Sequence, residues 1–376
     1  MSRSPLTVLP RDLLCLDDYE RLAPDFMSAA THAWIAGGSG GERCLGESPR
    51  AFSAVHVYNR LMADVSGGHT RVDLLGTTLL HPVLLAPVAF QRLVHPEGEL
   101  ATARATAATD TCMVLSTLSS CSLEDVASAS TAPRWFQLYF QHAQEITADL
   151  VSRAERSGYT AIVVTLDASV KLASRRALRA GFVMPAQVQA ASLEHYPGPA
   201  RRELASEASI VFQGMMADAP SWADMQWLLA STRLPVLVKG VSHPDDAARL
   251  LEMGVAGFVV SGHGGRALDE LPAPLHLLPA IRAIAGKDIP VLLDGGVRSG
   301  ADVFKAIAMG ASAVMVGRPQ MYALAVAGAL GVAHMIKTLR DELEVCMAQA
   351  GCPTLASIDR RALWFPGTRT VEACSC

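Results

Sequence analysis

The chain has 376 residues, of which 50% are hydrophobic and 18% are charged, and its formal net charge at pH 7 is −4. This length exceeds that of a typical domain but suits one large α/β barrel, and the apolar content is enough to fill a large core. The acidic balance and the lack of a basic stripe argue against a nucleic-acid partner. No apolar run approaches the roughly 18 residues that a membrane span needs, so no membrane partner is expected.

The N-terminus and the cysteines indicate the compartment. The first residues lead into an acidic stretch and lack the features of a signal peptide. The eight cysteines are scattered without a C-x-x-C pair, so we expect a reduced, cytoplasmic protein rather than a disulfide scaffold. Cys374 and Cys376 are expected to be free thiols in a frayed tail.

Residues from about 12 to 60 are expected to form a helical preface. Asp17 and Asp18 open a helix that is predicted to continue as far as Ile35. The glycine-rich run at 37–41 stops it. Because no strand precedes these glycines, a flexible turn is a better interpretation than a phosphate loop.

From about residue 80 to 363, short apolar runs alternate with helix-like segments. Eight such runs predict a closed (β/α)8 barrel that makes one domain with the preface. The predicted strands are 82–86, 112–116, 134–138, 161–166, 235–239, 257–261, 290–294 and 313–317. An open doubly wound sheet is the alternative, but it would require a G-x-G-x-x-G after the first strand, and the sequence has none.

One connection is unusually long. More than fifty residues separate Asp167 from Trp222, and a loop of this length in a compact domain is usually a lid or a mobile segment. Because the insertion, at about 183–221, follows the fourth predicted strand, we expect it to overhang the active face of the barrel. A surface loop without a role is the alternative.

The turn after the sixth strand carries the most informative side chains. His263 and Arg266 stand there among three glycines, at the end of the barrel where active sites are found. The histidine suits proton transfer near neutral pH, and the planar fork of the arginine suits a carboxylate. A small anionic substrate is therefore expected, although a structural Gly-rich turn would leave the same pattern.

Polar residues also follow most other strands. Gly-rich turns and arginines after the last two strands, at Gly296, Arg298, Gly317 and Arg318, are typical of the phosphate site of these barrels. Lys239 can place positive charge beside a ring that becomes anionic on reduction. Hydrogen bonds to the edge of a planar heterocycle are expected from Ser116, Gln137 and Thr165. This inventory fits flavin mononucleotide (FMN).

In these segments the sequence resembles the FMN-dependent 2-hydroxy-acid oxidases and dehydrogenases, such as glycolate and lactate oxidases, mandelate dehydrogenase and flavocytochrome b2. The resemblance runs from about residue 19 to 363. It is carried by 86–89, 95–99, 136–139, 238–240, 261–266, 294–298 and 317–319.

The resemblance implies a role for individual residues in oxidising an (S)-2-hydroxy acid to the 2-oxo acid. His263 takes a proton from the substrate, Asp167 stabilises the imidazolium, Tyr139 bonds the substrate and Arg266 pairs with its carboxylate. The residues that it implies around FMN are Pro87, Val88, Ala89, Ser116, Gln137, Thr165, Lys239, Ser261, Asp294, Gly296, Arg298, Gly317 and Arg318. It also implies a homotetramer, and O2 is favoured as the electron acceptor because the sequence shows no haem-binding domain.

The sequence departs from the family at three positions. Trp34 stands where the family has a tyrosine that bonds the carboxylate. Ser174 aligns with a second carboxylate-binding arginine, which a small loop shift would replace by Arg175. The asparagine that precedes the histidine in the family is Gly262 here.

Two of three carboxylate contacts are therefore expected to be missing, at roughly 1.5–3 kcal/mol each. The hypothesis that follows is a substrate bulkier than glycolate or lactate, held by Trp34, Phe90 and Leu118. Core packing of Trp34 and Leu118 is the alternative. The departures also leave open another FMN-barrel chemistry (a monooxygenase, an oxidative decarboxylase or an isomerase) or a barrel that binds without catalysis.

Overall fold

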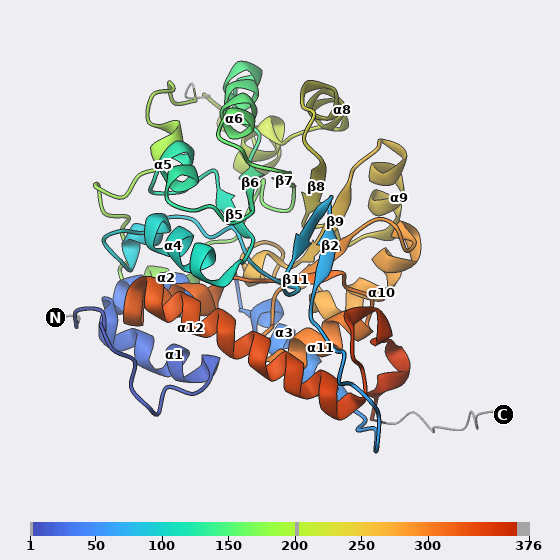
Figure 1. Ribbon diagram of the computed structural model, residues 1–376. Coiled ribbons are helices and arrows are strands. Elements are labelled where there is room, and N and C mark those ends of the chain that lie inside the picture. The colour runs from blue at the N-terminus through green and yellow to red at the C-terminus, as the bar shows by residue number, and fades with distance from the viewer. Residues whose placement is uncertain (1–2, 200–202, 367–376) are drawn as a thin grey trace.

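The computed structural model describes residues 3–199 and 203–366, so the Cys374/Cys376 tail lies outside the described residues. Its centre is a closed barrel of eight parallel strands, with helices outside it (Figure 1). The strands are β4 (Val83–Leu85), β5 (Met113–Ser116), β6 (Arg134–Leu138), β7 (Ile162–Thr165), β8 (Val236–Lys239), β9 (Gly257–Ser261), β10 (Val291–Asp294) and β11 (Ala313–Val316). All eight strands and the (β/α)8 fold predicted from the sequence are confirmed.

The strands form where the sequence has short, nearly continuous apolar runs, because a parallel strand in a barrel is buried on both faces. Alternate residues contribute to two separate hydrophobic clusters, and Leu84, Val114 and Leu292 belong to the smaller one. Leu74 and Leu79 join the same cluster from the hairpin of β2 (Val72–Leu74) and β3 (Thr77–Leu79). The hairpin thus packs on the interior of the barrel.

The surrounding helices bury their apolar faces against the strands. They are α4 (Glu99–Thr109), α5 (Leu123–Ser128), α6 (Gln144–Arg156), α8 (Trp222–Ser231), α9 (Pro244–Glu252), α10 (Pro274–Ala285), α11 (Gly300–Ala308) and α12 (Arg318–Ala350). Short 3-10 turns are η2 (Gln91–Leu93), η6 (His263–Gly265), η7 (Leu355–Ser357) and η8 (Arg360–Ala362). The pairing of β1 (His56–Val57) with β12 (Leu363–Trp364) joins the end of the preface to the C-terminal region.

Helix α12 is the one helix of the described chain with the length and apolar character of a membrane span. It is interrupted at Ala327 and Gly328, whose backbone angles are not helical. Its most apolar window is 67% buried, and the helix packs on α1, α4 and α11. This is the burial of a core helix, and it explains why the run is so apolar.

The preface is helical, but the single helix predicted up to Ile35 is wrong. The chain forms α1 (Leu16–Leu22), the 3-10 turn η1 (Ala23–Phe26) and α2 (Ala29–Ala36). The break has two local causes: Pro24 starts a new turn, and the Ser28 hydroxyl accepts a hydrogen bond from the Thr31 N–H and so begins α2. After the glycine-rich run comes α3 (Arg43–Ser53).

The glycine-rich run at 37–41 is buried over residues 37–40 and exposed only at Gly41, so it is fixed by packing and is not a flexible surface turn. The Gly41 N–H donates to Asp269 at 2.5 Å, and the Gly37 carbonyl accepts from Arg318 at 2.8 Å. The run therefore ties the preface to the loops after β9 and β11.

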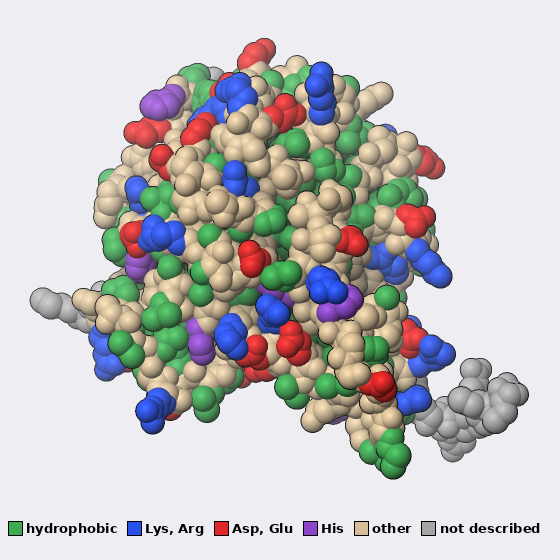
Figure 2. All heavy atoms as spheres, viewed as in Figure 1, with side chains coloured by type: hydrophobic (Ala, Val, Ile, Leu, Met, Phe, Trp, Pro, Cys, Tyr) green, Lys and Arg blue, Asp and Glu red, His purple; other side chains and the backbone are tan. Residues whose placement is uncertain are grey.

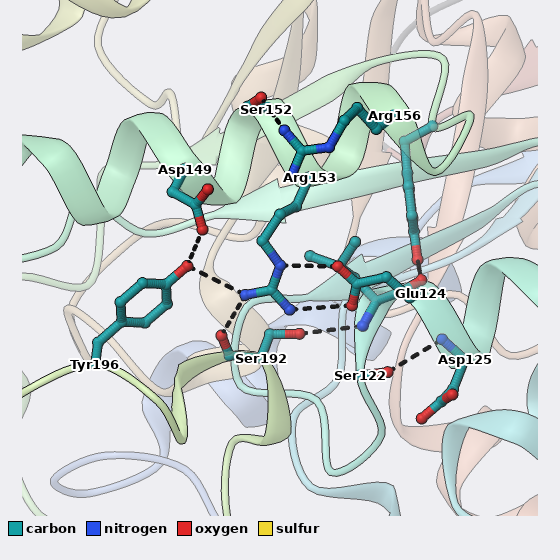
Figure 3. A network of polar contacts seen from close by, with 11 residues as sticks. Ser122, Glu124, Asp125, Asp149, Ser152, Arg153, Arg156, Ser192 and Tyr196 are labelled. Atoms are coloured by element: carbon teal, nitrogen blue, oxygen red, sulfur yellow. Dashed lines mark hydrogen bonds and ion pairs between the residues drawn. The ribbon is translucent and has the colours of Figure 1, made fainter.

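After β7 comes α7 (Arg175–Arg179), and the insertion that follows contains η3 (Ala191–Leu193), the π-helical turn η4 (Ile210–Gly214) and η5 (Met215–Asp218). Its first part is fixed to α5 and α6 by the network in Figure 3. Arg153 donates to Glu124 at 2.8 and 3.0 Å, to the Ser192 carbonyl at 2.9 Å and to the Tyr196 hydroxyl at 3.2 Å. Tyr196 in turn donates to Asp149. This part of the insertion is thus packed against the barrel helices.

Charge is distributed evenly on the face seen in Figure 2, where cationic and anionic side chains are interspersed. That face offers no cationic stripe of the kind that nucleic acids bind.

Candidate active site

A cavity of about 200 Å³ lies at the C-terminal ends of the barrel strands. Its lining brings together residues from the preface, from the ends of all eight barrel strands and from the start of α12. It consists of Trp34, Ile35, Ala86, Pro87, Val88, Ala89, Phe90, Ser116, Leu118, Gln137, Tyr139, Thr165, Lys171, Lys239, His263, Gly264, Arg266, Asp294, Gly317, Arg318 and Met321. Most of the site residues predicted from the sequence are therefore neighbours in space.

His263 and Asp167 form a buried pair across the cavity wall. His263 Nδ1 lies 2.7 Å from Asp167 Oδ1. The backbone N–H of His263 donates to Ser261 Oγ at 2.9 Å, and this hydrogen bond helps to hold the residue at a φ of 52°. Burial lowers the pKa of His263, although the hydrogen bond to Asp167 opposes this effect. The imidazole is therefore neutral at pH 7, with Nδ1–H donated to Asp167 and Nε2 left as a base.

Asp167 remains ionised in spite of its burial. Burial acts to raise its pKa, but the hydrogen bond from His263 and the charge of Lys239 bring the pKa below its ordinary value. The carboxylate sits directly on Gly240, whose φ is 95°: a Cβ there would lie 2.3 Å from Asp167 Cγ. Glycine at 240 thus makes room for the carboxylate.

Tyr139 completes this side of the cavity. Its hydroxyl lies 3.4 Å from His263 Nε2, and burial raises its pKa to about 12. The phenol is consequently protonated near neutral pH. It can donate a hydrogen bond to the His263 imidazole, or to a substrate group that takes the place of the imidazole as the acceptor.

Lys239 is the buried cation at the floor of the site. Its ammonium lies 2.9 Å from Asp294 and donates to Ser261 Oγ at 2.7 Å, and Ser261 donates to Asp294 at 2.6 Å. Burial acts to lower the pKa of Lys239, but Asp294 and Asp167 raise it above the ordinary value. The lysine is charged and immobilised.

Two buried polar atoms of the cavity wall that have no hydrogen-bond partner among the described residues indicate that the cavity fits a flavin. Gln137 Oε1 accepts from Ser116 Oγ and from the Thr117 N–H, both at 3.2 Å, which leaves Gln137 Nε2 to donate. Gln137 Nε2 and Thr165 Oγ1 are buried and have no hydrogen-bond partner among the described residues. Buried polar atoms are almost always paired, so these two fit the polar edge of a bound heterocycle.

The phosphate end also fits. A smaller cavity of about 50 Å³ adjoins the first and is lined by Ser48, Gly295, Gly296, Arg298 and Gly317 among others. Gly296 has a φ of 85°, and a Cβ there would lie 2.5 Å from the Ser48 carbonyl oxygen, so only glycine leaves this pocket open. Helix α12 starts at this point, and helix N-termini attract phosphate.

The two arginines predicted near the phosphate differ in their partners. Arg318 lines both cavities and donates to the carbonyls of Ile35 at 3.0 Å and Gly37 at 2.8 Å. Arg298 lines the smaller cavity and lies 3.4 Å from Glu20. The preface thus helps to hold both guanidinium groups in place.

Arg266 lies between the cavity and the preface. It donates to the carbonyl of Trp34, and to that of Ile35 at 3.2 Å, and its guanidinium lies 4.6 Å from the centre of the Trp34 ring. The Trp34 ring also stacks on the Phe182 ring, with the ring centres 5.3 Å apart. Trp34 therefore positions Arg266 instead of offering the hydroxyl that a tyrosine would.

Arg175, a predicted substrate-binding residue, lies away from the site. It is exposed, in the first turn of α7, where the Ser174 hydroxyl accepts from the Ala177 N–H. The described residues of 183–221 do not line the central cavity either. Pro220 and Ser221 instead line a neighbouring cavity of about 260 Å³ behind Asp167.

Sequence reasoning missed Lys171 and Phe182. Lys171 lines the central cavity, and Phe182 supports Trp34. Lys171 lies only four residues after Asp167, within the stretch where the sequence departs from the family, so a search of that stretch for a replacement cation would have found it.

Gly262, the third departure from the family, has a partner in the preface. A Cβ at 262 would lie 2.7 Å from Cys44 Sγ, and Cys44 is fully buried. The φ of Gly262 is −95°, so its backbone tolerates any residue and the restriction is one of space. The thiol occupies the volume that an asparagine side chain would need.

We expect Gly262→Asn to lower the free energy of unfolding by about 1–3 kcal/mol, because it overpacks a closed site. Combining it with Cys44→Ala is expected to recover part of this loss. Urea unfolding of the two single variants and the double variant measures the coupling. Equal losses with and without Cys44 would contradict the proposed competition for space.

The fold and the site together define a flavin-binding barrel oxidoreductase that handles a small anionic substrate. The FMN-dependent dehydrogenase family model matches residues 23–365. The chain therefore belongs to the FMN-dependent dehydrogenases, and it is an FMN-dependent 2-hydroxy-acid oxidoreductase.

Two relatives and one structure show how close the likeness is. An L-lactate oxidase of Alicycliphilus denitrificans is 57% identical over 360 residues, which are 96% of this chain and 99% of the relative. A peroxisomal (S)-2-hydroxyacid oxidase of Arabidopsis thaliana is 40% identical over 92% of this chain and 94% of the relative. A mandelate oxidase crystal structure with (S)-2-phenylpropionate superposes with a TM-score of 0.84 and is 39% identical, covering 93% of this chain and 98% of that one.

Proposed function

We propose that the protein oxidises an (S)-2-hydroxy acid to the 2-oxo acid, with His263 as the base and O2 as the electron acceptor. The observation that carries the proposal is the buried pair of His263 and Asp167, which faces Tyr139 and Arg266 across one cavity. A base, a hydrogen-bond donor and a carboxylate ligand are what this oxidation requires of the protein.

Each residue has a distinct task in the proposed mechanism. His263 Nε2 takes the proton of the substrate hydroxyl, and Asp167 stabilises the imidazolium through Nδ1–H. Tyr139 donates to the substrate oxygen, and Arg266 holds the carboxylate with the part of its guanidinium that the preface carbonyls leave free. FMN, when bound, would supply the acceptor for the α-hydrogen and the two electrons of its bond to carbon, so that the substrate loses the equivalent of one hydride and one proton.

The FMN contacts in the proposal follow the lining of the two cavities. Gln137 and Thr165 meet the polar edge of the ring, and Lys239 supports negative charge on it. Gly296, Gly317 and the first turn of α12 hold the phosphate. The remaining predicted contacts are Pro87, Val88, Ala89, Ser116, Ser261, Asp294, Arg298 and Arg318.

Apolar residues in the cavity lining support a substrate with an apolar side chain larger than that of lactate. Trp34, Phe90 and Leu118 all line the cavity. L-Lactate itself is the second candidate, because relatives 57% and 46% identical are named L-lactate oxidases.

Steady-state kinetics on glycolate, L-lactate and (S)-mandelate test the choice of substrate. We expect kcat/KM to be highest for mandelate and lowest for glycolate. A maximum at lactate would favour the second candidate, and efficient turnover of glycolate would contradict both. Release of the 2-oxo acid, rather than of an acid one carbon shorter, separates this reaction from monooxygenase or decarboxylase chemistry.

Hydrogen peroxide formed in air, in amounts equal to the 2-oxo acid, tests O2 as the acceptor. Relatives that are named oxidases support it. Reduction of an added dye without peroxide would indicate a dehydrogenase instead. The homotetramer that we infer from the family is checked by light scattering.

A further inference from the structure

We propose that Lys171 is a specificity-determining residue that clamps the substrate carboxylate together with Arg266. In this proposal the lysine supplies the cation that is lost at Ser174. The inference depends on the proposed oxidation of a 2-hydroxy acid, and it assigns one further residue to the same site.

The position of Lys171 carries the proposal. The residue lies in the loop between Asp167 and α7, and its side chain lines the central cavity with Trp34, His263 and Arg266. Its ammonium lies 6.0 Å from the centre of the Tyr139 ring, the residue that also faces His263. The ammonium is therefore placed beside the hydrogen-bonding groups that surround the substrate.

The ammonium of Lys171 is uncompensated. Among the residues that the structure describes, its nitrogen lies near the Tyr139 ring and has no hydrogen-bond acceptor and no carboxylate partner. Although Lys171 as a residue is exposed, desolvation of its ammonium in the cavity lowers its pKa, Asp167 opposes this effect, and Arg266 and Lys239 act in the same direction as desolvation. A substrate carboxylate placed between Lys171 and Arg266 would supply the anion that this part of the cavity lacks.

The neighbouring cations are already committed. Lys239 is paired with Asp294. Arg176 is paired with Glu42, and Arg175 does not line the cavity. The loop after β7 thus offers Lys171 as its cation for the substrate.

The test compares Lys171→Met and Lys171→Arg with Arg175→Met, a matched control in the same loop. Anaerobic flavin reduction by (S)-mandelate and L-lactate gives the substrate Kd and the limiting rate. Titration with pyruvate, followed by the flavin spectrum, gives a Kd without turnover. We expect Lys171→Met to raise both Kd values roughly 10- to 100-fold, as for a lost charged hydrogen bond, and to change the limiting rate much less.

The conservative variant and the pH dependence separate a charge contact from a structural role. Lys171→Arg and Arg175→Met are expected to stay within about 3-fold of the parent protein. Because the Lys171 pKa is below its ordinary value of about 10.4, the pyruvate Kd should rise at alkaline pH, and this rise should disappear in Lys171→Arg.

Two negative results are distinguishable. If the parent flavin is reduced but Lys171→Met binds both acids as tightly as the parent does, the inference is wrong and the proposed function stands. If neither acid reduces the parent flavin, the proposed function is wrong and the inference falls with it.

Discussion

Replacing His263 by alanine is expected to lower the anaerobic rate of flavin reduction by about 10²- to 10⁴-fold, while the purified protein remains yellow. The imidazole is the neutral base that faces the cavity, and Tyr139, with a pKa of about 12, cannot replace it near pH 7. FMN should be retained because the phosphate pocket lies between the last two strands and α12 and does not include the His263 side chain. Stopped-flow absorbance measures the rate.

The matched control is His142→Ala, which removes an exposed imidazole from the loop after β6 and should leave the rate unchanged. The pH profile of kcat/KM gives a second check. A base must be deprotonated to act, and burial keeps the His263 pKa below its ordinary value of about 6.5. Activity should therefore fall only as the pH drops below that value. An unchanged rate in His263→Ala would show that His263 is not the base.

The second large effect is expected for Asp167→Asn, which should lower the rate of flavin reduction by about 10²- to 10⁴-fold. The carboxylate accepts Nδ1–H of His263 at 2.7 Å and stabilises the imidazolium that forms when Nε2 takes a proton. An amide of the same size keeps the packing against Gly240 but removes the charge. Stopped-flow reduction by mandelate or lactate measures the loss.

The same substitution makes a directional prediction for pH. Asp167 raises the pKa of His263 against the effect of burial, so its neutralisation lets that pKa fall further. The acid limb of kcat/KM should then move to lower pH while the plateau drops. Asp246→Asn, in the cavity behind Asp167, is the control and should change neither. A plateau that stays at the parent level would show that Asp167 has no part in proton transfer.

Several features of the fold could be predicted because their signals are local. Each barrel strand is a short apolar run bounded by turn residues, and β6 and β9 begin and end at the predicted residues. Helices α9 and α11 belong to the helix-like segments that alternate with these strands in the sequence. The prediction of one continuous helix in the preface was wrong because single residues, Pro24 and Ser28, set the boundaries of the helices there.

The candidate site was predictable for a different reason. In a parallel barrel the C-terminal ends of all strands meet on one face, so polar residues at those ends become neighbours wherever they lie in the sequence. His263, Asp167 and Tyr139 could be grouped in this way, and their hydrogen bonds support the grouping.

The sequence by itself determined the barrel, the order of its strands and most of the residues that surround the site, because each depends on a local pattern or on the symmetry of the fold. Only the tertiary structure decided how the departures from the family are accommodated. Trp34 stacks on Phe182 and holds Arg266, and Cys44 fills the space beside Gly262. These packing and polar contacts join segments that are far apart in the chain. Contacts of this kind leave no periodic signal in a single sequence.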